Sequence, residues 1–436
     1  MSTRVLSEDV VKHVGKQVHI EGWLHKKRLL GGLTFINVRD RRGLIQVVVK
    51  DKDEVEKLRG MQIGTVLKVV GTVKEEPRAQ GGAEIHDPKI EILVPVTEEP
   101  PIEIDKPLSH QSEHLDTLFD NRVLGLRNLQ EAKIFRIRSQ TLRFIREYLY
   151  ENDFVEINTP KLVAGAAEGG AEVFKLDYFG QEATLAQSPQ LYKQIMVGVY
   201  ERVFEIAPAF RAELSATTRH VSEVTMLDVE MGFIDSHEEV MKFLQDLLYR
   251  VLTRLYKECG DELKSLNAPE LKITPEFPSY SMAEIHELYQ KETGKDVSKE
   301  IDLNPDEERW ICEYAKKKHG CEAVFATGLP QSKMKFYHMK GDDGVARSGD
   351  LLFRGIEIAT VPQREHRYEK LLEQMKSAGV DPKSPGFAPY LSAFKHGLPA
   401  HGGFGFGIDR LVEKTVGLNN VKEAILFPRD INRLTP

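Results

Sequence analysis

Residues 210–231, "FRAELSATTRHVSEVTMLDVEM", restrict the fold of this chain more than any other segment. Two arginines, one histidine and four carboxylates lie between apolar stretches with the composition of buried strands. Charged groups are costly to bury unless they are paired. The fold must therefore either expose this segment as a solvated hairpin or gather its charges into a polar site, and the segment alone leaves both alternatives open.

The pattern of residues 202–231 predicts two strands joined by a turn. Arg211 falls at the end of the first strand beside Glu213, and Arg219 and His220 fall in the turn-rich return "LSATTRH". A guanidinium is planar and binds phosphate oxygens at two points. Such a hairpin is suited to holding a polyphosphate between its two ends.

Two later segments carry similar chemistry. In "RSGDLLFRGIEIATVPQREHR", Asp350 and Glu357 lie seven residues apart across a strand and a turn, and paired carboxylates are ligands that Mg²⁺–nucleotide complexes require. In "HGGFGFGIDRLVEK", the glycines allow a backbone to approach a ligand closely, and Arg410 follows at the start of a helix. Three charged segments in otherwise apolar strands together favour a site over a solvated surface.

Two weaker signals lie upstream. In "AQSPQLYKQIMVG", Ser188, Gln190 and Lys193 occupy the start of an apolar helix, where a lysine either extends to solvent or binds an anion. In "AGAAEGGAEVF", Glu168 lies in a Gly/Ala-rich loop that either has no role or closes over a cationic group.

Residues 17–95 contain five short β-rich runs separated by Gly, Asp and Pro signals, which predicts a small Greek-key barrel of the OB type. The chain has a net charge of −7, yet its first 50 residues hold ten basic and four acidic side chains. Single-stranded nucleic acid on the barrel is one interpretation, and a purely structural barrel is the other.

The rest of the chain predicts an α+β domain. A Pro-rich acidic segment near 96–110 indicates a linker, and residues 133–150 have the apolar stripe of a helix. Runs of strands followed by helices favour a mostly antiparallel sheet. We divide the chain into a barrel domain (1–104), a linker or hinge (105–130) and an α+β domain (131–436).

Nothing in the sequence indicates a membrane or an export signal. No apolar run approaches the roughly 20 residues of a membrane helix, and the N-terminus lacks an apolar targeting segment. The three cysteines lack metal-ligand spacing. We expect a cytoplasmic protein with reduced thiols.

In this order, the segments resemble the class II aminoacyl-tRNA synthetases, and within them the aspartyl-tRNA synthetases of archaeal type (class IIb). The helix with "FVEINTP" resembles motif 1, "FRAE…TRH…E" motif 2, and "GFGIDRL" motif 3. The likeness covers nearly the whole chain. It implies that the barrel is an anticodon-binding domain, that residues 131–436 are a class II catalytic domain, and that Pro160 lies at the interface of a homodimer.

The resemblance also implies site residues. ATP contacts fall on Arg211, Glu213, Arg219, His220, Glu357 and Arg410, with Arg211 catalytic at the α-phosphate. Mg²⁺ ligands fall on Asp350 and Glu357. Aspartate contacts fall on Glu168, Ser188, Gln190, Lys193, Asp228 and Arg364, of which the two cations select a carboxylate. Anticodon contacts fall on Arg28, Phe35 and Gln46.

The implied activity is ATP-dependent formation of aspartyl-adenylate from L-aspartate and transfer of the aspartyl group to the 3′ end of tRNA(Asp). A second substrate, tRNA(Asn), stays open: His25 resembles relaxed members, and Gln80 matches neither kind. One alternative is a tRNA-independent paralogue that activates aspartate or an analogue for another acceptor. The other is an RNA-binding module without activity, which would not need the charged residues of all three motifs.

Several positions depart from the family pattern. Val361 and Pro362 replace a usual Gly-Gly, Val224 replaces an aromatic residue that stacks on adenine, and Gly349 replaces a Phe. In the barrel, Leu29 replaces an Asp. Changes grouped around one pocket favour the paralogue, whereas the retained Phe35 and Gln46 favour the tRNA ligase.

Overall fold

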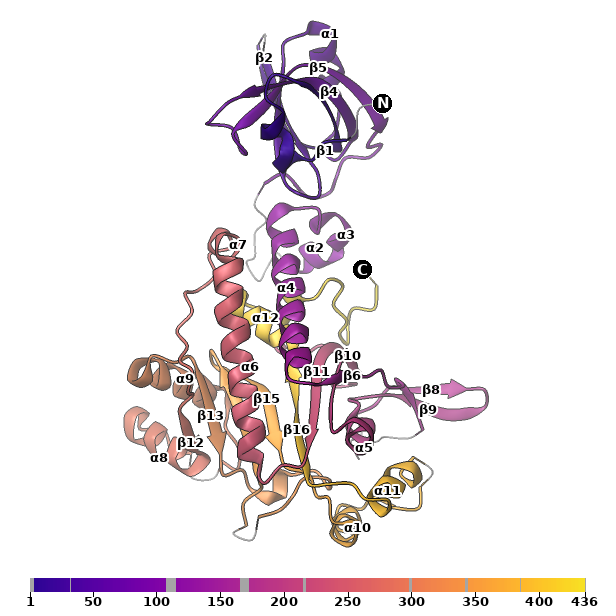
Figure 1. Cartoon of the computed structure of the whole chain (residues 1–436), viewed down its shortest axis with the longest axis vertical. Coiled ribbons are helices and arrows are strands. Elements are labelled where there is room, and N and C mark those ends of the chain that lie inside the picture. Colours follow the sequence, from indigo (N-terminus) through magenta and orange to yellow (C-terminus); the bar gives the residue numbers. More distant parts are fainter. Residues whose placement is uncertain are drawn as a thin grey trace. The chain divides into compact units, whose positions relative to one another are not determined.

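The computed structural model describes residues 4–31, 33–106, 115–164, 172–214, 217–297, 300–341, 344–384 and 386–435 (Figure 1). The chain divides into two compact units, Met1–Ala132 and Lys133–Pro436, each with its own apolar core. Within the described ranges, no helix is long and apolar enough to cross a membrane.

The first unit contains a closed five-stranded barrel in the order β1-β2-β3-β5-β4, which confirms the predicted OB-type fold. Its elements are a 3₁₀ helix η1 (Ser7–His13), β1 (Gln17–Leu30), β2 (Leu33–Arg39), β3 (Leu44–Val49), α1 (Lys52–Arg59), β4 (Val66–Glu75) and β5 (Ala83–Val94). The side chain of Asp51 caps α1 by accepting hydrogen bonds from two backbone amides of its first turn.

Strand alternation decides which barrel residues face outward. Ile36, Val47 and Val49 are fully buried in the barrel core, so their neighbours point the other way. Phe35 and Gln46 therefore lie on the outer face, where cross-strand pairing places Arg28 opposite Phe35. The three residues predicted to contact the anticodon thus share one side of β1, β2 and β3.

The predicted linker contains helical structure, and a buried ion pair connects it to the start of the next helix. Two short helices, α2 (Leu115–Asp120) and α3 (Arg122–Gly125), precede α4 (Leu129–Glu151). Arg122 donates to Glu131 at 2.7 Å, and both side chains are fully buried. Helix α4 starts four residues before the first residue of the predicted helix (133–150).

The second unit is built on an eight-stranded sheet in the order β12-β13-β14-β15-β16-β11-β10-β6 within the described residues. Neighbouring strands are antiparallel except for the edge pairs β12–β13 and β10–β6, so the mostly antiparallel sheet is confirmed. The strands are β6 (Val155–Glu156), β10 (Arg202–Phe210), β11 (Glu223–Gly232), β12 (Ser279–Ser281), β13 (Ala323–Thr327), β14 (Ser348–Phe353), β15 (Ile356–Pro362) and β16 (His401–Gly407). A small separate sheet is formed by β7 (Leu162–Val163), β8 (Lys175–Tyr178) and β9 (Gln181–Leu185).

The long helices α4 and α6 (His237–Glu258) lie across one face of this sheet and bury the main apolar core against it (Figure 1). The pair Ser236 and Glu239 forms a capping box at the start of α6. The remaining elements are α5 (Gln190–Tyr200), α7 (Gly260–Ser265), α8 (Met282–Thr293), α9 (Pro305–His319), α10 (Tyr368–Ser377), α11 (Ala388–Lys395), α12 (Ile408–Val416), and the 3₁₀ helices η3 (Gln331–Lys333) and η4 (Val421–Ala424).

The two faces of the central strands differ in chemistry. On β11, Leu227 and Val229 belong to the core under the helices, while Asp228 lines a cavity on the opposite face. On β16, Phe404 and Phe406 belong to the core, while Gly405 lines the cavity. The period-two geometry of a strand thus places an apolar core on one side of the sheet and a polar site on the other.

We expect Leu248→Ala, on the fully buried face of α6, to destabilise the second unit by about 2 to 5 kcal/mol, because it leaves a cavity in the core. The chain has two tryptophans, Trp23 in the first unit and Trp310 in the second. Urea unfolding followed by Trp310 fluorescence in a Trp23→Phe background isolates this transition. The exposed Lys257→Ala on the same helix is the control, and equal midpoints for the two variants would contradict the core assignment.

Candidate active site

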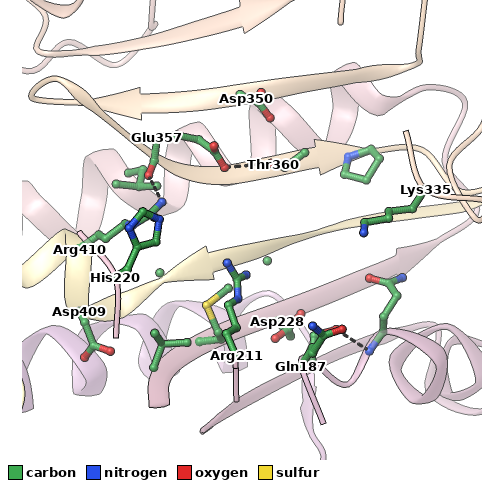
Figure 2. A pocket seen from close by; sticks show the side chains of 18 of the residues that line it. Gln187, Arg211, His220, Asp228, Lys335, Asp350, Glu357, Thr360, Asp409 and Arg410 are labelled. Atoms are coloured by element: carbon green, nitrogen blue, oxygen red, sulfur yellow. Dashed lines mark hydrogen bonds between the residues drawn. The ribbon is translucent and has the colours of Figure 1, made fainter. Parts of the chain in front are cut away.

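A cavity of about 450 Å³ lies on the polar face of the sheet. Its walls come from the β10–β11 hairpin, the start of α5, β14 to β16, the start of α12 and residues 329–338 (Figure 2). The cavity brings together most of the predicted site: Ser188, Gln190, Arg211, Glu213, Arg219, His220, Asp228, Asp350, Glu357, Arg364 and Arg410.

The other predicted residues lie elsewhere. Lys193 is buried behind the cavity wall, with 1% of its side chain exposed. Arg28, Phe35 and Gln46 belong to the barrel unit, and Pro160 is exposed in the segment after β6. Glu168 lies outside the described residues.

Lys193 is the centre of a buried ionic network. Its ammonium donates to Asp228 Oδ1 at 3.0 Å and to the Phe404 carbonyl at 3.0 Å, and it lies 3.4 Å from Glu230 Oε2. Asp228 and Glu230 both project from β11 on the polar face of the sheet. Protein oxygens thus replace water around the ammonium of this buried lysine.

Arg364 completes the network from the other side. Its guanidinium makes two parallel bonds to Glu230, Nε to Oε1 at 2.8 Å and an Nη to Oε2 at 3.0 Å. Burial acts to raise the pKa of Glu230, but Arg364 and then Lys193 outweigh it and hold that pKa below the ordinary value. Two cations therefore balance two carboxylates at the base of the cavity.

Gly403 permits this arrangement. A Cβ at this position would clash with the Val229 carbonyl and with the Glu230 carboxylate. The glycine-rich pattern of β16 indeed marks a close approach, and at Gly403 the partner is a protein carboxylate. Gly405, two residues later, leaves the cavity floor open beside Asp228.

A neutral hydrogen-bonded layer supports the ionic network. Gln190 donates to Gln194, whose amide nitrogen lies 2.8 Å from His401 Nε2. The other imidazole nitrogen lies 2.8 Å from the Pro399 carbonyl, which can only accept, so Nδ1 carries the proton and Nε2 accepts from Gln194. Burial lowers the pKa of His401 to about 4, so this tautomer is neutral at pH 7.

The hairpin end of the cavity contains cationic side chains that can exchange their protein partners for a ligand. Arg211 has 44% of its side chain exposed and lies 3.8 Å from Glu213, which also contacts His220 at 3.5 Å. Arg219 pairs with Glu308 of α9 at 2.8 Å. Arg410 donates to the Glu357 carbonyl at 2.9 Å, and Figure 2 shows Arg410, His220 and Glu357 grouped at one end of the cavity.

Asp350 and Glu357 form a pair of like charges on adjacent strands. Burial, and then the charge of Glu357, raise the pKa of Asp350 well above its ordinary value. Asp350 Oδ1 is buried and has no hydrogen-bond partner within the described residues. An unsatisfied carboxylate oxygen beside a second carboxylate suits a hard cation, although the described residues contain no group of three or more His, Cys, Asp or Glu arranged to hold one.

The four residues of the second unit that depart from the family pattern divide into two sets. Val224 and Pro362 line the cavity, whereas Val361 is fully buried in the apolar core and points away from it. A side chain at Gly349 would contact Met241 of α6, also away from the cavity. Two of these four positions can therefore touch a ligand directly.

Sequence reasoning missed several residues that build the site. The sequence pattern gives no role to Glu230, although this residue lies within residues 210–231, and it does not mark Gln194, His401 or Lys335. Alternation with Asp228 could have placed Glu230 on the same face. Nothing local could have paired it with Arg364, which lies 134 residues away.

Comparison with known families agrees with this geometry. Residues 114–431 match the class II tRNA synthetases (D, K and N), and residues 18–93 match the OB-fold nucleic acid binding domain. The chain therefore belongs to the class II tRNA synthetases of the D, K and N group, with an OB-fold domain before the catalytic one.

Individual relatives cover the chain nearly end to end. The aspartate–tRNA(Asp/Asn) ligase of Thermus thermophilus is 43% identical over 99% of this chain and 100% of its own length. The aspartate–tRNA(Asp) ligase of Pyrococcus furiosus is 41% identical over 97% of both chains. Among solved structures, the asparaginyl-tRNA synthetase of Pyrococcus horikoshii complexed with asparaginyl-adenylate superposes with a TM-score of 0.91 over the full length of both chains, at 31% identity.

We expect Glu230→Gln to destabilise the second unit by roughly 3 to 5 kcal/mol, because it leaves an uncompensated positive charge between Lys193 and Arg364. Urea unfolding monitored by Trp310 in the Trp23→Phe background measures the loss. Glu223→Gln, an exposed carboxylate on the same strand, is the matched control. A Glu230→Gln midpoint equal to that of the control would show that the network does not stabilise the fold.

Proposed function

We propose that this chain is an aspartate–tRNA ligase, which activates L-aspartate with ATP and transfers the aspartyl group to the 3′ end of tRNA(Asp). The names of its nearly full-length relatives support the reaction and the amino acid. One observation carries the proposal: a single cavity joins an arginine-bearing hairpin and a carboxylate pair to a pocket built on Lys193, Asp228, Glu230 and Arg364.

The two ends of the cavity suit the two substrates. Arg211, Arg219, His220 and Arg410 can bind the phosphates of ATP, and Glu213 can contact the adenine side. Ser188, Gln190 and Asp228, together with Glu168, can hold the amino and carboxyl groups of aspartate. Lys193 and Arg364 lie at the base of the same end and can attract a carboxylate side chain, while Asp228 and Glu230 offset most of their charge.

The first chemical step needs positioning and charge neutralisation more than proton transfer. An oxygen of the aspartate α-carboxylate bonds to the α-phosphorus while the bond to the bridging oxygen breaks and pyrophosphate leaves. Arg211, exposed at the hairpin end, can neutralise the charge that develops on the α-phosphate. No general base is required, because the attacking carboxylate is already ionised.

Asp350 and Glu357 would hold Mg²⁺. The unpartnered oxygen of Asp350 and the like-charge pair fit a hard cation, and the phosphate oxygens of ATP can supply further ligands. When bound, Mg²⁺ would offset the negative charge of the triphosphate.

The outer face of the barrel would bind the anticodon. Phe35 offers a ring for base stacking and Gln46 an amide for a base edge, with Arg28 opposite Phe35. Gln46 donates to Glu84 across β3 and β5, so base recognition would share or replace that bond. We further propose a homodimer with the exposed Pro160 at its interface, acting in the cytoplasm where tRNA is charged.

Charging of unfractionated tRNA, followed by sequencing of the charged species, tests the proposal as a whole. Aspartate-dependent ATP–pyrophosphate exchange with charged tRNA(Asp) supports it, and charged tRNA(Asn) in addition would identify a relaxed enzyme. Exchange without charging would favour the tRNA-independent alternative, for which Pro362 in the cavity wall is the structural argument.

We expect Arg211→Ala to lower aspartate-dependent ATP–pyrophosphate exchange by about a hundredfold to a thousandfold, since it removes a cation aimed at developing charge. The measurement is the exchange rate at saturating ATP and aspartate. Arg250→Ala, an exposed arginine on α6, should leave the rate unchanged. Full exchange by Arg211→Ala would remove this residue from the α-phosphate site.

We expect Gln46→Ala to reduce kcat/KM for charging of tRNA(Asp) by about tenfold, because one base contact is lost. Exchange in the absence of tRNA should be unaffected, since the barrel takes no part in activation. Gln17→Ala, exposed at the start of β1, is the control. Unchanged charging by Gln46→Ala would exclude it from anticodon recognition.

A further inference from the structure

Residues 334–339 lie alongside residues 363–365, which follow β15 and include Arg364. His338 pairs with Arg364 in an antiparallel bridge, Met339 donates its amide to the Gln363 carbonyl at 2.9 Å, and Glu365 donates to the Tyr337 carbonyl at 3.0 Å. The Arg364 guanidinium also lies 5.6 Å from the centre of the Tyr337 ring. This segment is therefore part of the wall around the ionic network.

The segment is held firmly on both sides of Lys335. Phe336 and Tyr337 are buried in an apolar cluster, and the side-chain amide of Gln374 donates to the carbonyls of Phe336 and His338. Met334 Sδ lies 3.1 Å from His338 Nδ1. With its flanking residues anchored, Lys335 has a fixed starting point for its side chain.

Lys335 points into the cavity. Its side chain lines the cavity wall, at the end opposite to Glu357, His220 and Arg410 (Figure 2). Within the described part of the chain, no hydrogen bond or ion pair engages its ammonium. Lys335 thus differs from Lys193 and Arg364, whose charges are occupied by protein carboxylates.

The charge balance of this end of the cavity explains why an additional cation matters. Asp228 and Glu230 neutralise Lys193 and Arg364, so a substrate that brings a side-chain carboxylate adds one unmatched negative charge. Burying a carboxylate against a network with no net charge is unfavourable. A neutral amide side chain would not incur this cost, so a further cation beside the network would strengthen the preference for the carboxylate.

We propose that Lys335 is a specificity-determining residue, whose ammonium pairs with the side-chain carboxylate of a dicarboxylic amino acid and so selects it over the corresponding amide. The inference rests on the proposed activation of an amino acid at this site. Lys335 would add to the recognition of the substrate's side chain, and the activation reaction would stay the same.

His338 supports this placement of Lys335. Burial lowers the pKa of its imidazole well below the ordinary value, and the charges of Arg364, Lys335 and Lys193 lower it further. The three cations thus act on one buried, neutral ring, which places Lys335 in the electrostatic neighbourhood of the amino-acid pocket. At pH 7 His338 adds no competing positive charge.

The test is ATP–pyrophosphate exchange by the full chain and by Lys335→Met, with aspartate and ATP varied in turn. Loss of a charge-assisted bond should raise the KM for aspartate by about ten- to a hundredfold, while the KM for ATP stays within about twofold. Lys335→Arg should restore most of the aspartate affinity. Lys340→Met, at an exposed lysine that directly follows this segment and does not line the cavity, should match the unaltered chain.

Titration calorimetry of the same proteins with L-aspartate and L-asparagine separates the two hypotheses. If the unaltered chain lacks exchange with aspartate, the proposed function fails, and calorimetry still decides the role of Lys335. Weaker binding of aspartate by Lys335→Met but not by Lys340→Met supports the inference. It is overturned if Lys335→Met binds aspartate as the unaltered chain does, if the unaltered chain binds none, or if only the KM for ATP rises.

Discussion

The polar face of the sheet in the second unit depends on one interaction, the charge-balanced pairing of Lys193 and Arg364 with Asp228 and Glu230. These groups lie on α5, on β11 and in the segment that follows β15, so three distant parts of the chain must reach their final positions before all of the charges are satisfied. Removing one partner leaves a buried charge, whereas the complete set is neutral. The network therefore both joins the sheet to α5 and fixes the floor of the site.

The neighbouring layers set how the site responds to a ligand. His401 and His338 are both kept neutral by burial, so neither changes charge near pH 7. The groups at the hairpin end are more exposed, and the guanidinium of Arg211 lies a long 3.8 Å from the Glu213 carboxylate. The floor of the cavity is therefore charge-balanced, whereas the cationic side chains at the hairpin end can turn toward phosphates. This division suits an amino acid that must be selected and a nucleotide whose phosphates must be held while one bond breaks.

Much of this architecture could be predicted from the sequence, because strands and their alternation leave local signals. The five barrel strands, the helix near 133–150 and the grouping of the three charged segments were all recovered. Glu230 and Lys335 were missed for a different reason. Glu230 acquires its role from Arg364, which is distant in the sequence. Lys335 belongs to "QSKMKFYHMK", where three lysines lie close together, and only the fold places Lys335 in the wall of the cavity.

The division of β16 into Phe404 and Phe406 on one face and Gly403 and Gly405 on the other has an evolutionary consequence. Adding or deleting one residue within this strand would exchange the faces, sending phenylalanine rings into the cavity and glycines into the core. Insertions and deletions of a single residue are thus not tolerated within β16. Descendants of this sequence can diversify through point replacements around the cavity rim, and through loops whose length the sheet does not constrain.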